Sequence, residues 1–371
     1  MQAVCPGGHP IGKTGVTERI FRYSGLAPLQ SFSAAIAGAK PDLIVSGDDL
    51  ATRHLHRLYV ENEHREEGAS LRELIERSLG SPEYFPIVDD RASFIRISLE
   101  AGARVPRNAT IANAENLRCW IASSGFPVVL KANGTSGGTG VRVVRNAEDA
   151  RRAFRELQAP PLLARAAKRA LFDGDTTLVW PSLLRHKSVV NAQAYICGHE
   201  ATTTTLCWRG EVLASLHFAV LQKSHSFGHA TVVRRIEHSG MVEATEKVAR
   251  RLGLSGFHGF DFMLAERTND AYLIEINPRA TQVGHLAFGP GRDLPAAMVS
   301  ALTSTPAQLS PIVTENDTIA LFPQEWLREP SSPYLHSGYH DVPWGQPELV
   351  RACVRKPRAL GSRILSRMTS R

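Results

Sequence analysis

Residues 259–279 read GFDFMLAERTNDAYLIEINPR and carry the strongest pattern in the chain. Apolar and polar residues alternate in Gly259–Leu264 and again in Ala271–Asn277, which is the pattern of two half-buried strands. The polar segment Glu266–Asp270 between them is typical of a turn. We therefore expect an antiparallel hairpin centred near Thr268.

The hairpin is expected to bring two acidic side chains together. Counting outward from its centre places Asp261 directly opposite Glu275, and Asn277 shares the face of Glu275 because alternate strand residues point the same way. Two facing carboxylates repel each other unless a cation neutralises them, and such oxygen ligands suit Mg²⁺. A solvated polar face is the alternative for any two of these residues, but Arg279 adds a fork that can bind phosphate. On the same counting, three residues of the second strand face a core: Tyr272, Ile274 and Ile276.

A second segment, Val128–Val144, reads VVLKANGTSGGTGVRVV. Lys131 lies inside an otherwise apolar strand, where its charge needs an anionic partner. The glycine-rich turn that follows has backbone N–H groups that could wrap a polyphosphate. It has neither the Gly-Lys-Ser/Thr of a Walker loop nor the spacing of a dinucleotide-binding fingerprint. A tight turn without a ligand is the alternative for such a loop, and Lys131 favours the phosphate.

Together the two segments resemble the ATP-grasp superfamily, in which a lysine-bearing strand and a glycine loop close over ATP and a later hairpin holds magnesium. The resemblance spans about Arg91 to Leu302, and Ala192–Glu200 (AQAYICGHE) is similar to the segment that crosses the adenine. It implies an α+β (mixed α/β) fold, in which two α+β subdomains grip ATP and a shortened α/β lobe precedes them. The expected domains are 1–88 for that lobe, 89–195 and 196–310 for the two subdomains, and 311–371 for a C-terminal extension with a basic tail.

The resemblance also implies roles for individual residues. Lys131 and Arg279 would be the catalytic residues, acting on the phosphates. Mg²⁺, for which Mn²⁺ could substitute, would be held by Asp261, Glu275 and Asn277. Many relatives have a lysine where this chain has Arg91, at the start of a helix, so Arg91 would have to serve in its place. The residues expected to contact ATP are Arg91, Lys131, Gly137, Gly138, Gly140, Gln193, Tyr195, Ile196 and Glu200.

Two pairs of residues near these segments are candidates for the substrate site. His225 and His229 lie in the polar loop SHSFGH, where a substrate-facing role competes with a zinc pair. A spacing of four brings zinc ligands together on a helix, which the residues between these histidines do not predict. His285 and Arg292 follow the magnesium strand and could bind the acceptor or its carboxylate. Ordinary surface positions are the alternative for each.

The rest of the chain alternates between helix and strand patterns. Pro41–Ser46 (PDLIVS) is expected to be a buried strand that leads into a helix at about Leu50–Val60, and β-type runs fill Val189–Val233. Beyond Pro311 no periodicity is clear. Further helices are expected at about Leu71–Leu79, Arg91–Ala101, Ala112–Ser123, Ala147–Leu157 and Met241–Leu252.

Composition narrows the class of protein. No stretch of the 371 residues approaches the roughly 18 apolar residues of a membrane span, and Met1–Pro10 lacks the pattern of a secretion signal. Five scattered cysteines are typical of reduced thiols in a cytoplasmic protein. Seven of the 43 Lys and Arg residues lie in Arg351–Arg371, which leaves 36 basic residues against 36 acidic ones elsewhere. We expect a solvated basic tail and a body without a nucleic-acid signature.

These observations predict a cytoplasmic, ATP- and Mg²⁺-dependent ligase that activates a carboxylate as an acyl phosphate and joins it to an amine, releasing ADP and phosphate. Its partners would be small-molecule carboxylate and amine substrates, with no nucleic acid and no membrane span, and a homodimer is left open. The alternatives are a kinase or thiol ligase on the same scaffold and a non-catalytic, nucleotide-binding regulatory subunit.

Overall fold

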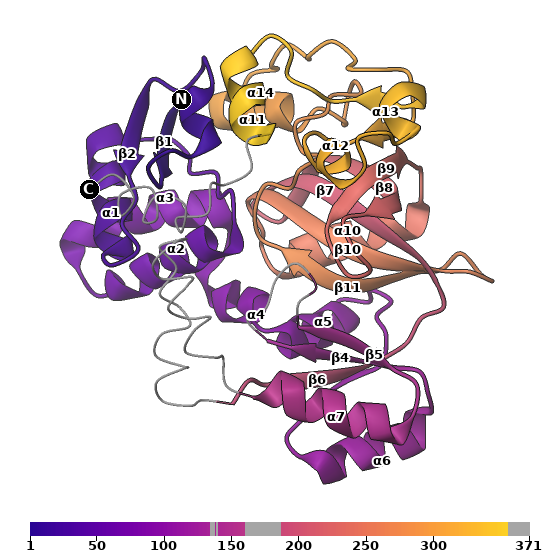
Figure 1. The fold of residues 1–371 in the computed structure, drawn as a ribbon. Helices are drawn as coiled ribbons and strands as arrows, with labels where there is room; N and C mark the ends of the chain where they lie inside the picture. The colour runs from indigo at the N-terminus through magenta and orange to yellow at the C-terminus, as the bar shows by residue number, and fades with distance from the viewer. Residues whose placement is uncertain (134–137, 139, 160–186, 355–371) are drawn as a thin grey trace, which may run out of the picture.

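The structure is a computed structural model that describes residues 1–133, 138, 140–159 and 187–354. These residues form a seven-stranded, a four-stranded and a two-stranded sheet. In Figure 1 the four-stranded sheet lies below the seven-stranded one, and the N-terminal elements lie to the left of the larger sheet. No helix in these ranges is long and apolar enough to cross a membrane.

The seven-stranded sheet has the order β11-β10-β7-β8-β9-β12-β13. The predicted β-type runs of Val189–Val233 are confirmed, and the four consecutive threonines at 202–205 suit a strand because they are β-branched. The sheet continues into the segment after Pro311, where no strand was expected: β12 pairs antiparallel with β9, and β13 pairs parallel with β12. The strands are β7 (Gly198–Trp208), β8 (Glu211–Lys223), β9 (Ala230–Arg235), β10 (Gly256–Ala265), β11 (Ala271–Asn277), β12 (Thr318–Ala320) and β13 (Tyr339–His340).

Helices cover the two faces of this sheet unequally. One face packs against α5 (Arg91–Glu100) and α10 (Ser239–Arg251), and Phe262 is fully buried there. The other face packs in part against α11 (Leu294–Thr303), and Phe218 is fully buried there. The rest of that second face borders a cavity that lies toward the four-stranded sheet.

The four-stranded sheet has the order β3-β6-β4-β5 and is backed by α6 (Ala114–Ser124) and α7 (Ala147–Gln158). Both helices confirm the prediction to within two residues. The helix α7 starts at an Asn146 cap and buries apolar residues at helical spacing, which fixes the face that it turns to the sheet. The strands are β3 (Asn108–Ile111), β4 (Val128–Ala132), β5 (Val141–Val144) and β6 (Val190–Ala194).

The N-terminal elements form a separate layer around their own core, which includes Leu55, Ile75 and Phe85. Two short parallel strands and a helix lie in residues 2–39, where no strand or helix was predicted. The predicted helices after Gly47 and before Gly80 are confirmed. The elements are β1 (Gln2–Cys5), β2 (Arg19–Arg22), α1 (Pro28–Ala39), α2 (Asp49–Glu61), α3 (Ala69–Leu79) and the short α4 (Phe85–Asp89).

The buried strand predicted at Pro41–Ser46 is wrong. This apolar run is extended but irregular, because its backbone bonds go elsewhere than to a neighbouring strand. The amide of Ile44 donates to Ser78 Oγ at 2.9 Å, and the carbonyl of Ser46 accepts from the amide of Ala280 at 2.9 Å. The run therefore ties the N-terminal layer to the segment that follows β11.

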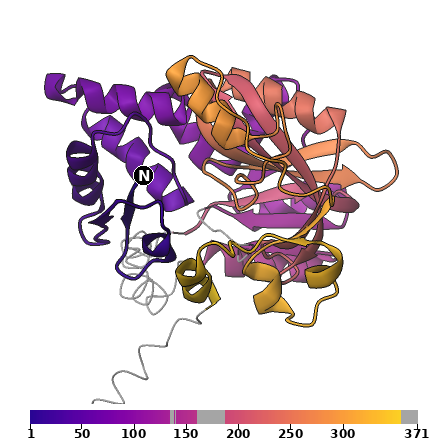
Figure 2. The same ribbon diagram turned by 90° about the horizontal axis from the view of Figure 1, so that it is seen from above.

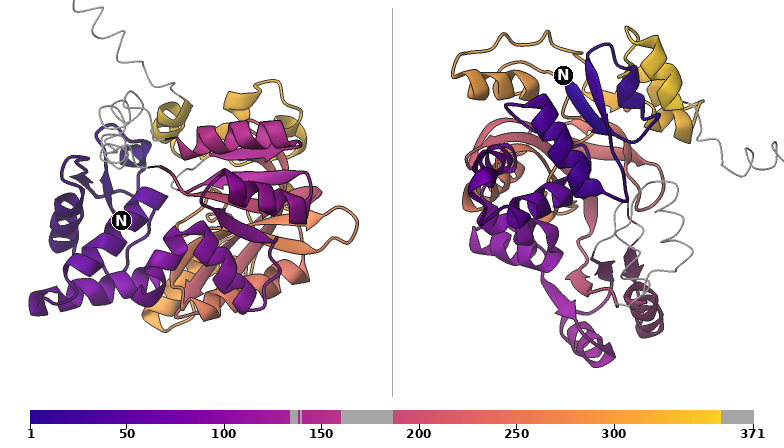
Figure 3. Two further views of the ribbon diagram at one scale, coloured as in Figure 1. Left: turned by 90° about the horizontal axis from the view of Figure 1, so that it is seen from below. Right: turned by 90° about the vertical axis from the view of Figure 1, so that its left-hand side faces the viewer.

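The C-terminal segment returns to the N-terminal layer. Its helices are α12 (Gln324–Arg328), α13 (Tyr334–Ser337) and α14 (Pro347–Val354), and α14 packs against the 3-10 helix η1 (Pro10–Lys13). Figures 2 and 3 show α14 beside the first strands. The expected domain boundaries stay a prediction, and two packing facts bear on them: α5 packs on the seven-stranded sheet, and β12 and β13 extend that sheet.

Candidate active site

The hairpin of β10 and β11 has the predicted register. Asp261 pairs directly with Glu275, and Gly259 pairs with Asn277. A bulge separates this part from the turn, because Phe262 already pairs with Leu273. Counting outward from a hairpin centre near Thr268 therefore predicted the pairing correctly on the side of the bulge that contains Asp261 and Glu275.

The bulge corrects the prediction about which residues face the core. One extra residue, Ile274, is inserted between the two pairings, so the alternation of side chains changes phase there. Leu273 is fully buried in the core, whereas Ile274 lines the cavity and Tyr272 is only half-buried. Ile276 is buried as predicted.

Asp261 is held by two neighbours and repelled by a third. Thr202 Oγ1 donates to its Oδ1 at 2.9 Å, and Asn277 Nδ2 donates to its Oδ2 at 2.9 Å. Burial, together with the charge of Glu275, raises the pKa of Asp261 to about 6. The repulsion between the facing carboxylates is therefore not balanced by the side chains around Asp261.

Glu275 has the opposite environment. Burial works against its ionisation, but Arg91 and Lys131 outweigh burial and hold the pKa of this carboxyl below its ordinary value. Arg91 makes two contacts here. Its Nη2 lies 2.8 Å from Glu275 Oε1, and its Nη1 donates to the carbonyl of Ala132 at the end of β4. Arg91 thus links the lysine strand to the acidic hairpin.

Lys131 itself is buried, with 8% of its surface exposed. Burial lowers the pKa of its ammonium group, and the nearby Glu275 opposes that shift. The next residues are fixed by a polar chain: Asn133 donates to the helix-capping Asp90 at 2.8 Å, and Asn191 donates to Asn133 at 2.9 Å. The strand end that carries Lys131 is therefore rigidly placed beside the start of α5.

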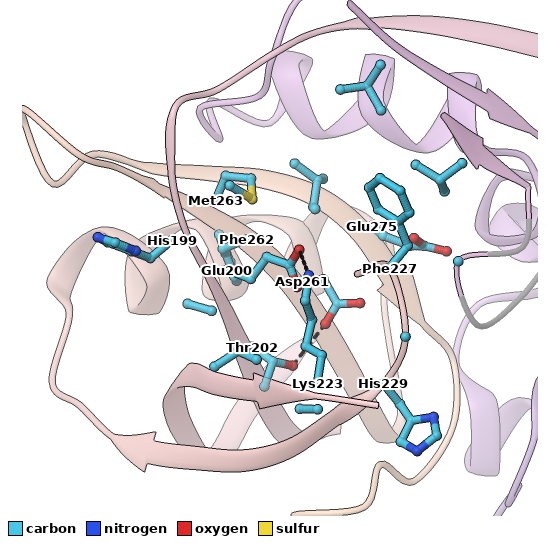
Figure 4. Close-up of a pocket in the computed structure, with 18 of the residues that line it drawn as sticks. His199, Glu200, Thr202, Lys223, Phe227, His229, Asp261, Phe262, Met263 and Glu275 are labelled. Carbon is cyan, nitrogen blue, oxygen red and sulfur yellow. Dashed lines mark hydrogen bonds and ion pairs between the residues drawn. The ribbon is translucent and has the colours of Figure 1, made fainter. Parts of the chain in front are cut away.

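These groups line a cavity of about 980 Å³ (Figure 4). Its lining includes residues of the seven-stranded sheet, of the four-stranded sheet and of the N-terminal layer. Most of the predicted site residues lie on its wall. They are Arg91, Lys131, Gly138, Gln193, Tyr195, Ile196, Glu200, His225, His229, Asp261, Glu275, Asn277 and Arg279.

The glycine loop and the loop between β8 and β9 meet at this cavity. Gly138 has a φ of +73°, and a Cβ built there would collide with the backbone of Phe227. Only glycine therefore fits this close approach. Gly140 is described but is not among the described lining residues, and its carbonyl accepts from the amide of Ala132 at 2.9 Å. Gly137 lies outside the described residues.

Two predicted substrate residues are not brought to the cavity. Neither His285 nor Arg292 is among its described lining residues. His285 is 58% exposed and its Nε2 lies 3.3 Å from Asp341 Oδ2, while Arg292 pairs with Glu237 at 2.8 Å. The lining of the cavity continues as far as Val283, and His285, two residues later, lies beside the C-terminal segment instead.

The histidines His225 and His229 line the cavity from the β8–β9 loop. Burial lowers the pKa of His229, and the neighbouring His225 adds to that shift. Within the described ranges, no three His, Cys, Asp or Glu side chains are grouped as a metal cluster would require. The zinc alternative for these histidines therefore has no support in the described residues.

Several lining residues were missed. Asp49, the first residue of α2, lies 2.9 Å from Arg279 through its Oδ1, although the two are 230 positions apart. Lys223 pairs with Glu200 at 2.6 Å. Alternation on a threonine-rich strand could have suggested that Thr202 faces Asp261, but only if the pairing of β7 with β10 had been known. Further lining residues not predicted include His199, Met263, Thr281 and Gln282.

Comparison with known proteins identifies the family. The model of the carbamoyl-phosphate synthase L chain, ATP-binding domain, matches residues 90–287, which is more than half of the chain. The carbamoyl phosphate synthase large chain of Kocuria rhizophila is 27% identical over 212 residues, a match that covers 54% of this chain and 17% of the relative. The N-terminal section of the same enzyme from Aquifex aeolicus is 25% identical over 252 residues, covering 67% of this chain and 41% of the relative. The chain thus spans less than half the length of these relatives.

Solved structures share the fold. The biotin carboxylase domain of 2-oxoglutarate carboxylase from Hydrogenobacter thermophilus, solved with MgADP and bicarbonate, has a TM-score of 0.57 at 16% identity, covering 84% of this chain and 66% of that one. An ADP complex of N5-carboxyaminoimidazole ribonucleotide synthetase also has a TM-score of 0.57, at 15% identity, covering 84% and 72%. The expected α+β fold is confirmed, and the chain belongs to the carbamoyl-phosphate synthase L chain ATP-binding domain family, within the ATP-grasp superfamily.

Proposed function

We propose that this chain is an ATP- and Mg²⁺-dependent ligase that activates a carboxylate as an acyl phosphate and transfers the acyl group to an amine. The observation that carries this proposal is the pair of facing carboxylates, Asp261 and Glu275, in a cavity that also holds Lys131, Arg91 and Arg279. Family membership supports it, as do the related structures, which were solved in complex with MgADP, ADP and bicarbonate.

The donor set fits magnesium. Two carboxylate groups and an amide oxygen are hard ligands, and burial together with the charge of Glu275 raises the pKa of Asp261, a cost of ionisation that a bound cation would relieve. Asp261, Glu275 and Asn277 would hold the ion, with Mn²⁺ as a substitute. When bound, it would neutralise charge on the phosphate oxygens of ATP.

The described residues divide the remaining work. Lys131 and Arg279 would hold the terminal phosphate, and Arg91 would hold a phosphate nearer the nucleoside. Residues Gln193–Ile196, at the end of β6 and the start of its link to β7, line the cavity. Their backbone would form hydrogen bonds with the adenine, and Glu200 would lie near the ribose.

The chemistry needs two displacements. A carboxylate oxygen attacks the terminal phosphorus, the bond to the bridging oxygen breaks, and ADP leaves. An amine then attacks the acyl carbon, and inorganic phosphate leaves. Lys131 and Arg279 would stabilise the charge that develops on the equatorial oxygens. The contact between the glycine loop and the Phe227 backbone would help exclude the water that hydrolyses an acyl phosphate.

Substrates, assembly and compartment are proposed at a coarser level. The acid and the amine would be small molecules, since the site is a cavity of about 980 Å³. We expect a homodimer to be compatible with the fold, because the related carboxylase domain was solved as a dimer. The five cysteines are all free thiols, which supports a reducing compartment such as the cytoplasm.

Hydroxylamine provides a test that needs only the acid to be found. It replaces the amine and converts an acyl phosphate into a hydroxamate, so a panel of carboxylic acids can be screened for ADP release and for hydroxamate by mass spectrometry. We expect one class of acid to give both products in equal amounts. ADP release with a stable phosphorylated product, or with a thioester when a thiol is supplied, would instead indicate a kinase or a thiol ligase.

A further inference from the structure

The N-terminal layer grips the end of β11 on both sides of Arg279. Before this arginine, Thr52 Oγ1 donates to the carbonyl of Pro278 at 2.8 Å, and Thr52 is fully buried. After it, the amide of Ala280 donates to the carbonyl of Ser46 at 2.9 Å. The backbone that carries Arg279 is therefore fixed by a layer far away in sequence.

The side chain of Arg279 is held by the same layer. Its Nε lies 2.9 Å from Asp49 Oδ1, and both residues line the cavity. Its other contacts are longer: Nη2 lies 3.4 Å from Asn277 Oδ1, and Nη1 lies 3.4 Å from the carbonyl of Ala280. Since hydrogen bonds weaken with distance, Asp49 is the main restraint on this guanidinium.

Among the described residues, the carboxylate of Asp49 has Arg279 as its hydrogen-bond partner, and its place in the first turn of α2 also favours the helix dipole. The N-terminus of α2 is already capped by Asp48, whose Oδ1 accepts from the amide of Ala51 at 2.7 Å. Docking of the layer onto β11 is supplied by Ser46 and Thr52. The carboxylate of Asp49 is thus left for the arginine.

We propose that Asp49 is a positioning residue: it holds Arg279 through Nε and leaves both Nη groups to the terminal phosphate of a bound nucleotide. An arginine side chain has many rotamers, and fixing it before the ligand arrives lowers the entropy cost of binding. The N-terminal layer then completes the nucleotide site. This inference rests on the proposed function in one respect, the assignment of Arg279 to the terminal phosphate.

The ion pair itself can be tested without any nucleotide. The ¹⁵N–¹H signal of Arg279 Nε is assigned by its loss in Arg279→Lys, and its exchange with water is then compared between variants. We expect slow exchange in the wild type and in Glu61→Gln, a control that removes a carboxylate from the same helix α2 at an exposed ion pair with Arg57. In Asp49→Asn the exchange should become fast. Equal protection in Asp49→Asn and the wild type would overturn the ion pair.

The positioning role predicts a selective loss for the terminal phosphate. Asp49→Asn should weaken calorimetric binding of a non-hydrolysable ATP analogue with Mg²⁺ about ten-fold, and binding of ADP less than about two-fold. Asp49→Glu should recover part of the loss, and Glu61→Gln should bind both nucleotides like the wild type. Equal losses for the analogue and ADP, or the same pattern in Glu61→Gln, would overturn the proposal in favour of general support of the fold.

The two failures are distinguishable. A wild-type protein that binds neither nucleotide contradicts the proposed function and with it the role of Arg279 toward a phosphate. The arginine signal would still decide whether Asp49 holds Arg279. In the other case the wild-type protein binds both nucleotides, and Asp49→Asn discriminates between them as the wild type does. That result contradicts only the positioning role.

Discussion

Glu275→Gln is expected to abolish acid-dependent ADP release while leaving the fold intact. The substitution keeps the shape of the side chain and removes its charge. It takes away one of the two facing carboxylates that would hold the metal, and it takes from Arg91 an ion-pair partner at 2.8 Å. We expect the rate to fall by at least about 100-fold, the scale seen when one charge-stabilising group is lost from an active site. The measurement is ADP release with the acid found in the hydroxylamine screen, alongside thermal unfolding.

A matched control comes from the same hairpin. Glu266 lies in its turn, is exposed, and accepts from Cys197 Sγ at 3.1 Å. Glu266→Gln removes the same charge from the same supersecondary unit and should leave ADP release unchanged. Full turnover in Glu275→Gln, or equal losses in both variants, would contradict the assignment of the metal site.

Lys131→Met is expected to weaken binding of an ATP analogue by about 100-fold without lowering stability. Met has a similar length and no charge, so it removes the cation while filling the space. Lys131 is buried and burial lowers its pKa, so in the absence of nucleotide the folded protein pays to keep this group charged. The unfolding temperature of the unliganded variant should therefore be unchanged or higher. Calorimetry and thermal unfolding measure the two effects.

The control for this change is Lys247→Met. Lys247 lies on α10, is half-buried and pairs with Glu243 at 2.6 Å, and it is not among the described lining residues of the cavity. It should bind the analogue like the wild type. An unaltered affinity in Lys131→Met would show that this buried lysine serves the sheet rather than a phosphate.

Local patterns sufficed where the interactions themselves are local. Alternation and turn composition predicted the hairpin, and symmetry about its turn predicted that Asp261 faces Glu275. Caps and helical spacing predicted α5, α6, α7 and α10 to within two residues at each end. Even here the bulge at Ile274 was missed, because one inserted residue changes the facing of its neighbours without changing the composition of the strand.

Interactions between distant segments could not be predicted in this way. The apolar run Pro41–Ser46 has the composition of a strand, but its backbone partners lie on α3 and after β11, so no ladder forms. The same junction brings Asp49 to Arg279, and no spacing in a single sequence reports a pair 230 positions apart. For His285, the expectation came from its nearness in sequence to the magnesium strand, whereas its imidazole lies beside Asp341 of the C-terminal segment, a residue 56 positions later.

The facing carboxylates of Asp261 and Glu275 and the buried Lys131 would together form a magnesium-dependent nucleotide site. This site is tested by calorimetric titration of the wild-type protein with a non-hydrolysable ATP analogue, with Mg²⁺ and again with a chelator. We predict binding with Mg²⁺ that weakens strongly in the chelator, because the phosphates would then meet Asp261 and Glu275 without a cation between them. Equal binding in both conditions, or no binding by a folded protein, would contradict the assignment of a magnesium-dependent nucleotide site.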